Sequence, residues 1–163
     1  MIAVIRTRQN GKSKKLCDLD LMKFTENQVR QRMNERGIEE DAFFICEITD
    51  WNVDRILSLR EAYVVKKAVE ELYDGDSTIV AYLLNEGRSI YFIATHYYKY
   101  LSKDEVEAMV KVIGQVESEK LLVTFYKTGS WVNFVSQYLK AGYLLQIKDK
   151  YYIDVAWKGG LIG

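Results

Sequence analysis

The sequence predicts an α+β fold of small mixed sheets and short helices. Near both ends of the chain apolar residues alternate with polar ones, as in strands, whereas the middle holds capped segments with a helical apolar period. Proline is absent, so glycine is expected to mark where elements end. With 163 residues, 48% of them apolar and 28% charged, the chain is long enough to bury a core.

Strands are predicted at the N-terminus from "IAVIR" and the alternating "KLCDLDL", with "TRQNGKSKK" as a hairpin tip between them. Further strands are expected at "AFFICEI" and "LLVTFY", and a C-terminal hairpin at "YLLQI" and "YYIDVAW" around "KDK". The segment "RSIYFIATHYYKYL" fits the strand period and the helix period equally and is left undecided.

Three helices are predicted from a capping box at the start and a glycine at the end. The boxes are Thr25 with Gln28, Ser58 with Glu61, and Ser102 with Glu105. Two more helices are expected at "DSTIVAYLLNEG", and at "SWVNFVSQYLKAG" between Ser130 and Gly142. Edges near Ser58 and Ser102 then divide the chain into three subdomains, 1–57, 58–101 and 102–163.

The expected compartment is the cytoplasm of a cell. Cys17 and Cys46 are too few for a disulfide framework, and both lie in apolar runs typical of buried, reduced thiols. No segment approaches the length of a membrane span, and the N-terminal residues do not resemble a signal peptide. The sequence "WKGGLIG" at the end of the chain is expected to be frayed.

Charge is distributed unevenly although the net charge is zero. Nine basic and four acidic residues give 1–36 a net charge of +5, four basic and twelve acidic residues give 37–86 a net charge of −8, and ten basic and seven acidic residues give 87–163 a net charge of +3. An acidic middle between basic ends points to charged partners. The alternative interpretation is an ordinary solvated helix surface.

No catalytic or metal-binding residues, and no cofactor, are predicted. His96 is the only histidine, and the two cysteines have no further ligand nearby, so a packed or surface histidine is the favoured interpretation. Phosphate-binding glycine motifs and a nucleophile elbow are both absent from the sequence. The segment "DGDS" at Asp74 lacks the spacing of a calcium loop and is interpreted as a turn and a helix cap.

Basic residues at the predicted hairpin tip suggest one alternative function, a nucleic-acid-binding accessory protein. Cations there would contact phosphates, and the twelve tyrosines and three tryptophans offer stacking surfaces. The candidate contacts are Arg6, Arg8, Lys12, Lys14 and Lys15.

A second alternative comes from the C-terminal region. The predicted order of strand, helix, glycine, strand and strand in 121–157, with Gly142-Tyr143 after the helix, resembles the last third of a GNAT-type acetyltransferase. The family's pyrophosphate loop is missing upstream. The resemblance therefore implies a degenerate GNAT-type acetyltransferase that lacks the loop needed to bind acetyl-CoA.

Residues 21–73 carry a more extensive similarity. A capped helix is followed by an acidic link, a strand that ends in "EITDW", and the helix "SLREAYVVKKAVEEL". This order resembles the ArdA family of antirestriction proteins, and "NFVSQYLKAGYLL" with "YYIDVAW" resembles the closing segment of that family. The positions that match are Glu40, Asp41, Phe44, Cys46, Ile48, Asp50 and Trp51 in the strand pattern, and Leu59, Glu61, Ala62 and Leu72 in the helix pattern.

The resemblance implies a phage or mobile-element protein that is elongated, forms homodimers, and mimics DNA phosphates with rows of carboxylates. Its expected partner is a host restriction-modification complex. Because both ends of this chain are basic, a different defence complex, for example a CRISPR effector, is the alternative expectation. The carboxylates that would form the acidic surface are Glu39, Glu40, Asp41, Glu47, Asp50, Asp54, Glu61, Glu70, Glu71, Asp74, Asp76 and Glu86.

Overall fold

The computed structural model describes residues 1–116 and 118–157, and it confirms the α+β class with helices and two small sheets. The described chain divides into two compact units, Met1–Thr95 and a second one that begins at His96. The predicted edges lay near Ser58 and Ser102 instead. Contacts keep the segment after Ser58 with the first unit, because the helix that starts there packs on the N-terminal sheet.

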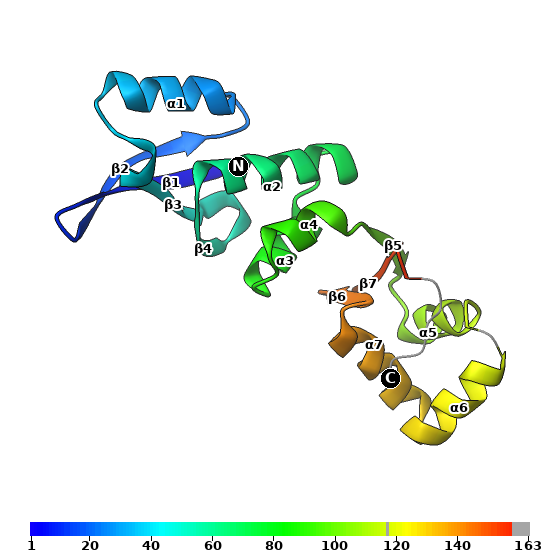
Figure 1. Cartoon of the computed structure of the whole chain (residues 1–163). Coiled ribbons are helices and arrows are strands. Elements are labelled where there is room, and N and C mark those ends of the chain that lie inside the picture. Colours follow the sequence, from blue (N-terminus) through cyan, green and yellow to red (C-terminus); the bar gives the residue numbers. More distant parts are fainter. Residues whose placement is uncertain (117, 158–163) are drawn as a thin grey trace. The chain divides into compact units, whose positions relative to one another are not determined.

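The first unit is built on a four-stranded sheet with the order β2-β1-β3-β4 (Figure 1). All its pairings are antiparallel, although mixed sheets were predicted. The strands are β1 (Ile2–Gln9), β2 (Lys12–Asp20), β3 (Phe43–Ile48) and β4 (Val53–Leu57). The predicted hairpin tip is confirmed: Asn10 and Gly11 both have positive φ, 50° and 75°, as a tight two-residue turn requires.

All three pairings of the sheet contain a register shift, and these shifts change which way the side chains point. Ile5 pairs with Cys17 while Arg6 pairs with Lys15, so Leu16 is an extra residue in β2. Cys46 is an extra residue in β3 by the same criterion. Because successive strand residues point to opposite faces, each bulge reverses the alternation beyond it.

Helices cover one face of this sheet, and Figure 1 shows α1 on one side of the strands. The helices of the first unit are α1 (Glu26–Glu35), α2 (Leu59–Leu72), α3 (Thr78–Asn85) and α4 (Ile90–Thr95), with short 3-10 turns at Glu40–Ala42 and Thr49–Trp51. Both predicted capping boxes of this unit, at Thr25 and Ser58, are confirmed. Apolar residues of α2 and α3 complete the core with Ile45 and Ile48 of the sheet.

Glu26 joins α1 to α2. Its carboxylate accepts hydrogen bonds from Arg30 at 2.6 Å within α1 and from Arg60 of α2 at 3.1 Å. Burial of the carboxyl raises its pKa, but the hydrogen bonds and charges of the two arginines outweigh burial and hold the pKa of Glu26 below its ordinary value.

We expect Glu26→Gln to lower the free energy of unfolding by about 1–2 kcal/mol at pH 7, because two charge-assisted hydrogen bonds are weakened. A depressed folded-state pKa contributes stability above the unfolded-state value of about 4.3 and loses it as pH falls through the folded-state value. Urea unfolding at pH 7 and below pH 4 should therefore show the two proteins converging in acid. Glu35→Gln, on the exposed side of α1, is the control; an equal loss in both variants would contradict the link.

The second unit contains a three-stranded antiparallel sheet with the order β5-β7-β6. Its elements are β5 (Tyr98–Ser102), α5 (Glu105–Ile113), α6 (Ser118–Thr128), α7 (Trp131–Ala141), β6 (Leu144–Ile147) and β7 (Lys150–Asp154). The core includes Phe134, Tyr138, Leu144, Ile153 and Trp157. The predicted C-terminal hairpin and the helix from Ser130 to Gly142 are confirmed.

Several sequence predictions differ from the structure. "LLVTFY", predicted as a strand, lies in α6, and the undecided segment divides into α4 and β5. The predicted cap at Ser102 is wrong: Asp104 caps α5 by accepting from the Glu107 N–H, and the Ser102 hydroxyl donates to the Glu107 carboxylate. Strand β4 was not predicted. The predicted frayed tail falls mostly on 158–163, outside the described residues.

Candidate functional site

One face of the four-stranded sheet is not covered by the helices of its unit. Residues in register on neighbouring strands point to the same face, so the pairings assign each side chain. The helix-covered face includes Ala3, Ile5, Ile45, Ile48 and Val53, each 0% exposed. We call the other face the open face; it is formed by Ile2, Val4, Arg6, Arg8, Ser13, Lys15, Asp18, Asp20, Phe44, Glu47, Asp54 and Ile56.

A row of carboxylates crosses the open face. Asp18, Val4, Glu47 and Asp54 are successive register partners on the four strands. Glu47 and Asp54 are directly opposite each other, and within the described part of the chain neither carboxylate has an ion-pair partner. Like charges in directly opposite positions destabilise a sheet. A sequence that keeps such a pair on an exposed face points to a role outside folding.

Two further carboxylates lie next to this row. Asp20 is in register with Ile2, and Asp50 accepts hydrogen bonds from the Ile2 N–H at 2.6 Å and from the amino group of Met1 at 2.8 Å. Burial raises the pKa of Asp50, but the hydrogen bonds and the positive amine outweigh it and leave the pKa below the ordinary value. Asp50 is therefore ionised at neutral pH and is paired with the amino group of Met1, while Asp20 lies 3.7 Å from that amino group and 3.7 Å from the Lys23 ammonium.

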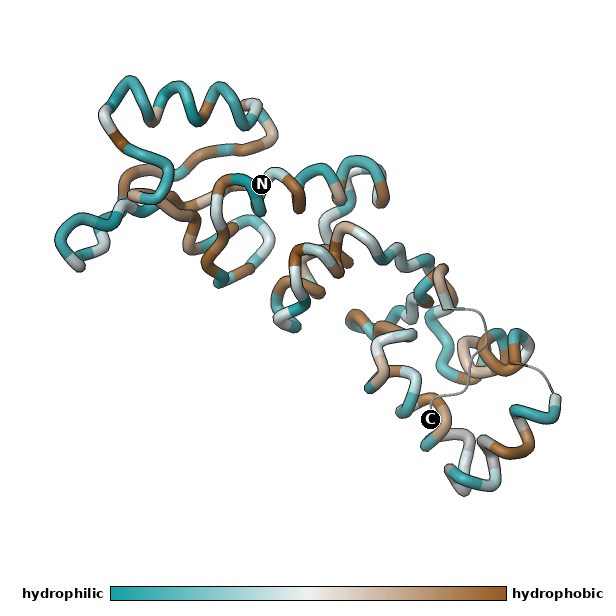
Figure 2. Tube along the Cα trace, viewed as in Figure 1, coloured by the Kyte–Doolittle hydropathy of each residue, from teal (hydrophilic) through white to brown (hydrophobic). Residues whose placement is uncertain are grey.

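Cations occupy the other end of the open face, toward the hairpin tip, which is hydrophilic in Figure 2. Arg6 donates to the Ser13 hydroxyl at 2.8 Å, Arg8 lies 4.5 Å from the centre of the Phe44 ring, and Lys15 pairs with Asp18 at 2.8 Å. The bulge sends Lys12 and Lys14 to the opposite side of the hairpin. The five predicted basic residues are thus split between two faces.

Apolar side chains lie among the charged residues of the open face: Ile2 beside Asp20 at the acidic end, Phe44 in register with Arg6 at the basic end, and Ile56 on β4. Ile56 is 61% exposed and Ile2 is 39% exposed, and Phe44 is half-buried. Protein–protein interfaces combine exposed apolar side chains with charged and polar ones. The open face therefore has the composition of a binding surface.

The other predicted acidic residues do not gather on this face. Glu40 pairs with Arg30, Glu70 with Lys66 and Glu71 with Lys67. Two lie at helix starts: Glu61 completes the box at Ser58, and the Asp76 carboxylate accepts from the N–H of Thr78, the first residue of α3, whose N-cap is Ser77. Those that lie exposed in turns or at element ends are Glu39, Asp41, Asp74 and Glu86.

Of the predicted acids, then, Glu47 and Asp54 lie on the open face and Asp50 lies at its edge. Sequence reasoning missed Asp18 and Asp20, which belong to the basic N-terminal segment. The alternation of "KLCDLDL" placed both aspartates opposite the apolar positions of that strand, and this was the signal that could have identified them.

The described residues were compared with the requirements of a metal site, of an acetyltransferase and of a membrane-spanning helix. They contain no group of three or more histidine, cysteine or acidic side chains able to hold a metal ion. His96 lies 4.0 Å from the buried Asp154 carboxylate. Helix α6 replaces the strand on which the acetyltransferase resemblance depended. Among the described helices, none combines the length and the apolar character needed to cross a membrane.

Comparison of the chain with protein-family models, with curated proteins and with solved structures finds no match.

Proposed function

We propose that this chain is a non-enzymatic inhibitor of a host nucleic-acid-directed defence complex, of the restriction-modification or the CRISPR effector type, and that it binds through the open face. The observation that carries the proposal is the acidic row of Asp18, Glu47 and Asp54 beside exposed apolar side chains. From the ArdA resemblance we further propose that the chain comes from a phage or mobile element. It would act in the host cytoplasm as a homodimer.

The acidic row matches the chemistry of a nucleic-acid-binding cleft. Such clefts are lined by lysine and arginine side chains that neutralise phosphates. Glu47 and Asp54 are on adjacent strands, whose backbones are about 4.8 Å apart, and Asp18 is two strands from Glu47, so the sheet fixes the backbone positions from which the carboxylates extend. Each one can accept charge-assisted hydrogen bonds from the cations of the cleft.

The basic end of the open face favours one orientation of the chain on its partner. If the acidic end enters a basic cleft, Arg6 and Arg8 lie at the rim, where they would meet acidic residues of the partner or the nucleic acid that it holds. The reverse orientation places like charges together, which costs several kcal/mol. One orientation on the partner is therefore favoured.

The test uses a purified restriction-modification complex and a purified CRISPR effector immobilised on a sensor surface. We expect the double variant Glu47→Lys with Asp54→Lys to lose affinity by about tenfold or more for whichever complex binds the unaltered chain, since two attractive contacts become repulsive. The control is Glu70→Lys with Glu71→Lys, the same change of charge on α2. An equal loss in both variants, or no binding of either complex, refutes the proposal.

Nucleic-acid binding is the second candidate function, and the placement of Arg8 over the Phe44 ring beside Arg6 and Lys15 favours it. The same surface experiment distinguishes the two. If the chain binds nucleic acid alone, its affinity should fall steeply with salt, and neutralising the five basic residues of the hairpin should flatten that slope. The Glu47 and Asp54 variant would then bind more tightly, because repulsion from phosphates is removed.

A further inference from the structure

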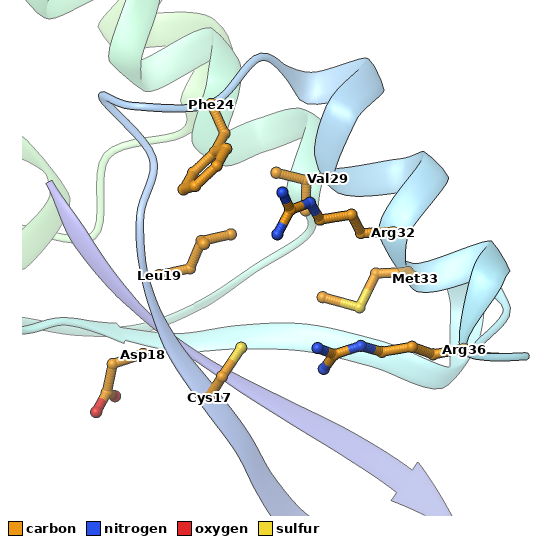
Figure 3. Close-up of a pocket in the computed structure, with 8 residues that line it drawn as sticks. All are labelled: Cys17, Asp18, Leu19, Phe24, Val29, Arg32, Met33 and Arg36. Atoms are coloured by element: carbon orange, nitrogen blue, oxygen red, sulfur yellow. The ribbon is translucent and has the colours of Figure 1, made fainter.

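A cavity of about 180 Å³ lies between α1 and β2 on the helix-covered side of the sheet, away from the open face (Figure 3). Its lining combines apolar side chains with arginines. The residues are Cys17, Asp18, Leu19, Phe24, Val29, Arg32, Met33 and Arg36.

Two guanidinium groups border this cavity. Arg32 and Arg36 are four residues apart at the end of α1, on the same side as Val29 and Met33. Arg32 lies 5.4 Å from the centre of the Phe24 ring. Within the described part of the chain neither guanidinium pairs with a carboxylate, in contrast to Arg30 of the same helix.

The acidic residue that lines the cavity does not neutralise these cations. Asp18 belongs to the open face, and its carboxylate pairs with Lys15 at 2.8 Å. In Figure 3 the Asp18 side chain points away from both arginines. The two guanidinium groups therefore have no carboxylate partner among the described residues, although they lie at the negative end of the α1 dipole.

The floor of the cavity is apolar. Val29 and Met33 are 2% and 5% exposed, and Leu19 and Phe24 complete the wall. Burial raises the pKa of the Cys17 thiol, with opposing effects from Arg36 and Lys15, so Cys17 is a neutral and weakly polar part of the lining. In another protein an engineered apolar cavity of about 150 Å³ binds benzene, so a single six-membered ring fits this volume.

We propose that this cavity binds a small organic carboxylate, with a body the size of one aromatic ring on the apolar floor and its carboxylate between Arg32 and Arg36. Arginine suits this ligand class because its planar group donates two parallel hydrogen bonds to a carboxylate. An anion also supplies the carboxylate partner that the two guanidinium groups lack among the described residues. The inference goes beyond the proposed function, since it uses a different face of the sheet and different residues.

Benzoate is the probe, titrated into the full chain and followed by calorimetry and ligand-observed NMR. We expect saturable binding with a dissociation constant on the order of 0.1–1 mM, as befits so few contacting atoms. Arg32→Gln and Arg36→Gln should each weaken it by about tenfold or more. Arg88→Gln is the matched control, because Arg88 also lies over a ring, that of Phe92 at 5.0 Å, but does not line the cavity.

Neutral benzamide tests whether charge matters, and we expect it to bind at least about tenfold more weakly than benzoate. A second readout locates the site: in a Cys46→Ser background, benzoate should slow alkylation of Cys17. Circular dichroism verifies that each variant is folded. The proposal is overturned if benzoate shows no saturable binding, if benzamide binds equally well, or if binding persists in both arginine variants.

Discussion

Replacing Phe134 by alanine is expected to lower the free energy of unfolding of the C-terminal unit by about 3–5 kcal/mol. Phe134 is 0% exposed and its ring centre lies 4.7 Å from that of Tyr138, in a cluster that includes Leu144 and Trp157. Removing the ring forfeits its burial and leaves a cavity that the sheet behind it fills only in part. A loss of this size is a large fraction of the stability of a small domain.

Urea unfolding followed by circular dichroism measures the loss, and hydrogen exchange in 98–154 shows where it occurs. Val106→Ala is the control, because Val106 is 61% exposed on α5 and its truncation should change stability by about 0.5 kcal/mol or less. If the Phe134 variant unfolds at the same urea concentration as the unaltered chain, Phe134 is not in the core.

The second large effect is expected at Arg55. One of its guanidinium nitrogens donates to the Arg88 carbonyl at 2.6 Å and to the Leu84 carbonyl at 3.4 Å, which ties β4 to the end of α3. The Leu84 carbonyl also accepts from the Gly87 N–H at 3.1 Å, so the loss of the Arg55 donor falls mainly on the Arg88 carbonyl in the segment after α3. We expect Arg55→Met to cost about 1.5–3 kcal/mol, since the methionine keeps the apolar stem and removes only the donors.

Arg55→Lys refines this prediction. A single ammonium can reach one carbonyl but has no planar fork, so stability should return only in part. Lys67→Met, an exposed change on α2, serves as the control for loss of one positive charge. Thermal unfolding of the four proteins measures the order. A midpoint for Arg55→Met equal to that of Lys67→Met would show that the carbonyl contacts contribute nothing.

Helix caps and glycines were the sequence signals that predicted helix starts and ends correctly. The boxes at Thr25 and Ser58 and the helix from Ser130 to Gly142 lie where they were predicted, because each depends on a few neighbouring residues. Ser102 also fitted the box pattern, but Asp104 stands two residues later and offers a carboxylate to the same helix start. The pattern alone did not distinguish the two candidates.

Secondary structure was predicted least well in short apolar runs. "LLVTFY" has the residue types of a strand, yet six residues do not fix the period, and in the structure they continue a helix that packs on α7. The strand Val53–Leu57 was not predicted, since Asp54 and Arg55 interrupt its apolar character. The Arg55 side chain donates to the carbonyls of Leu84 and Arg88, which are 29 and 33 residues further along the chain. No local sequence pattern predicts a contact over that separation.

The open face could be predicted only in part. Composition identified the acidic middle, but it did not show that Glu61 completes a capping box, that Asp76 accepts from the Thr78 N–H, or that Glu40 pairs with Arg30. Strand register decides which carboxylates share a face, and register here depends on bulges at Leu16 and Cys46. A bulge is set by how three strands fit together, so it carries no clear mark in the sequence.

Strand β2 forms an outer edge of the four-stranded sheet along Lys12–Asp20, and such an edge is a template on which further chains can pair and aggregate. Lys12, Lys14 and Lys15 occupy its first half, so a second copy aligned in parallel would bring ammonium groups together. The bulge at Leu16 interrupts the regular spacing of the outward N–H and C=O groups at the middle of the strand. The residues that make the hairpin basic therefore also protect the newly made chain from fibrous self-association.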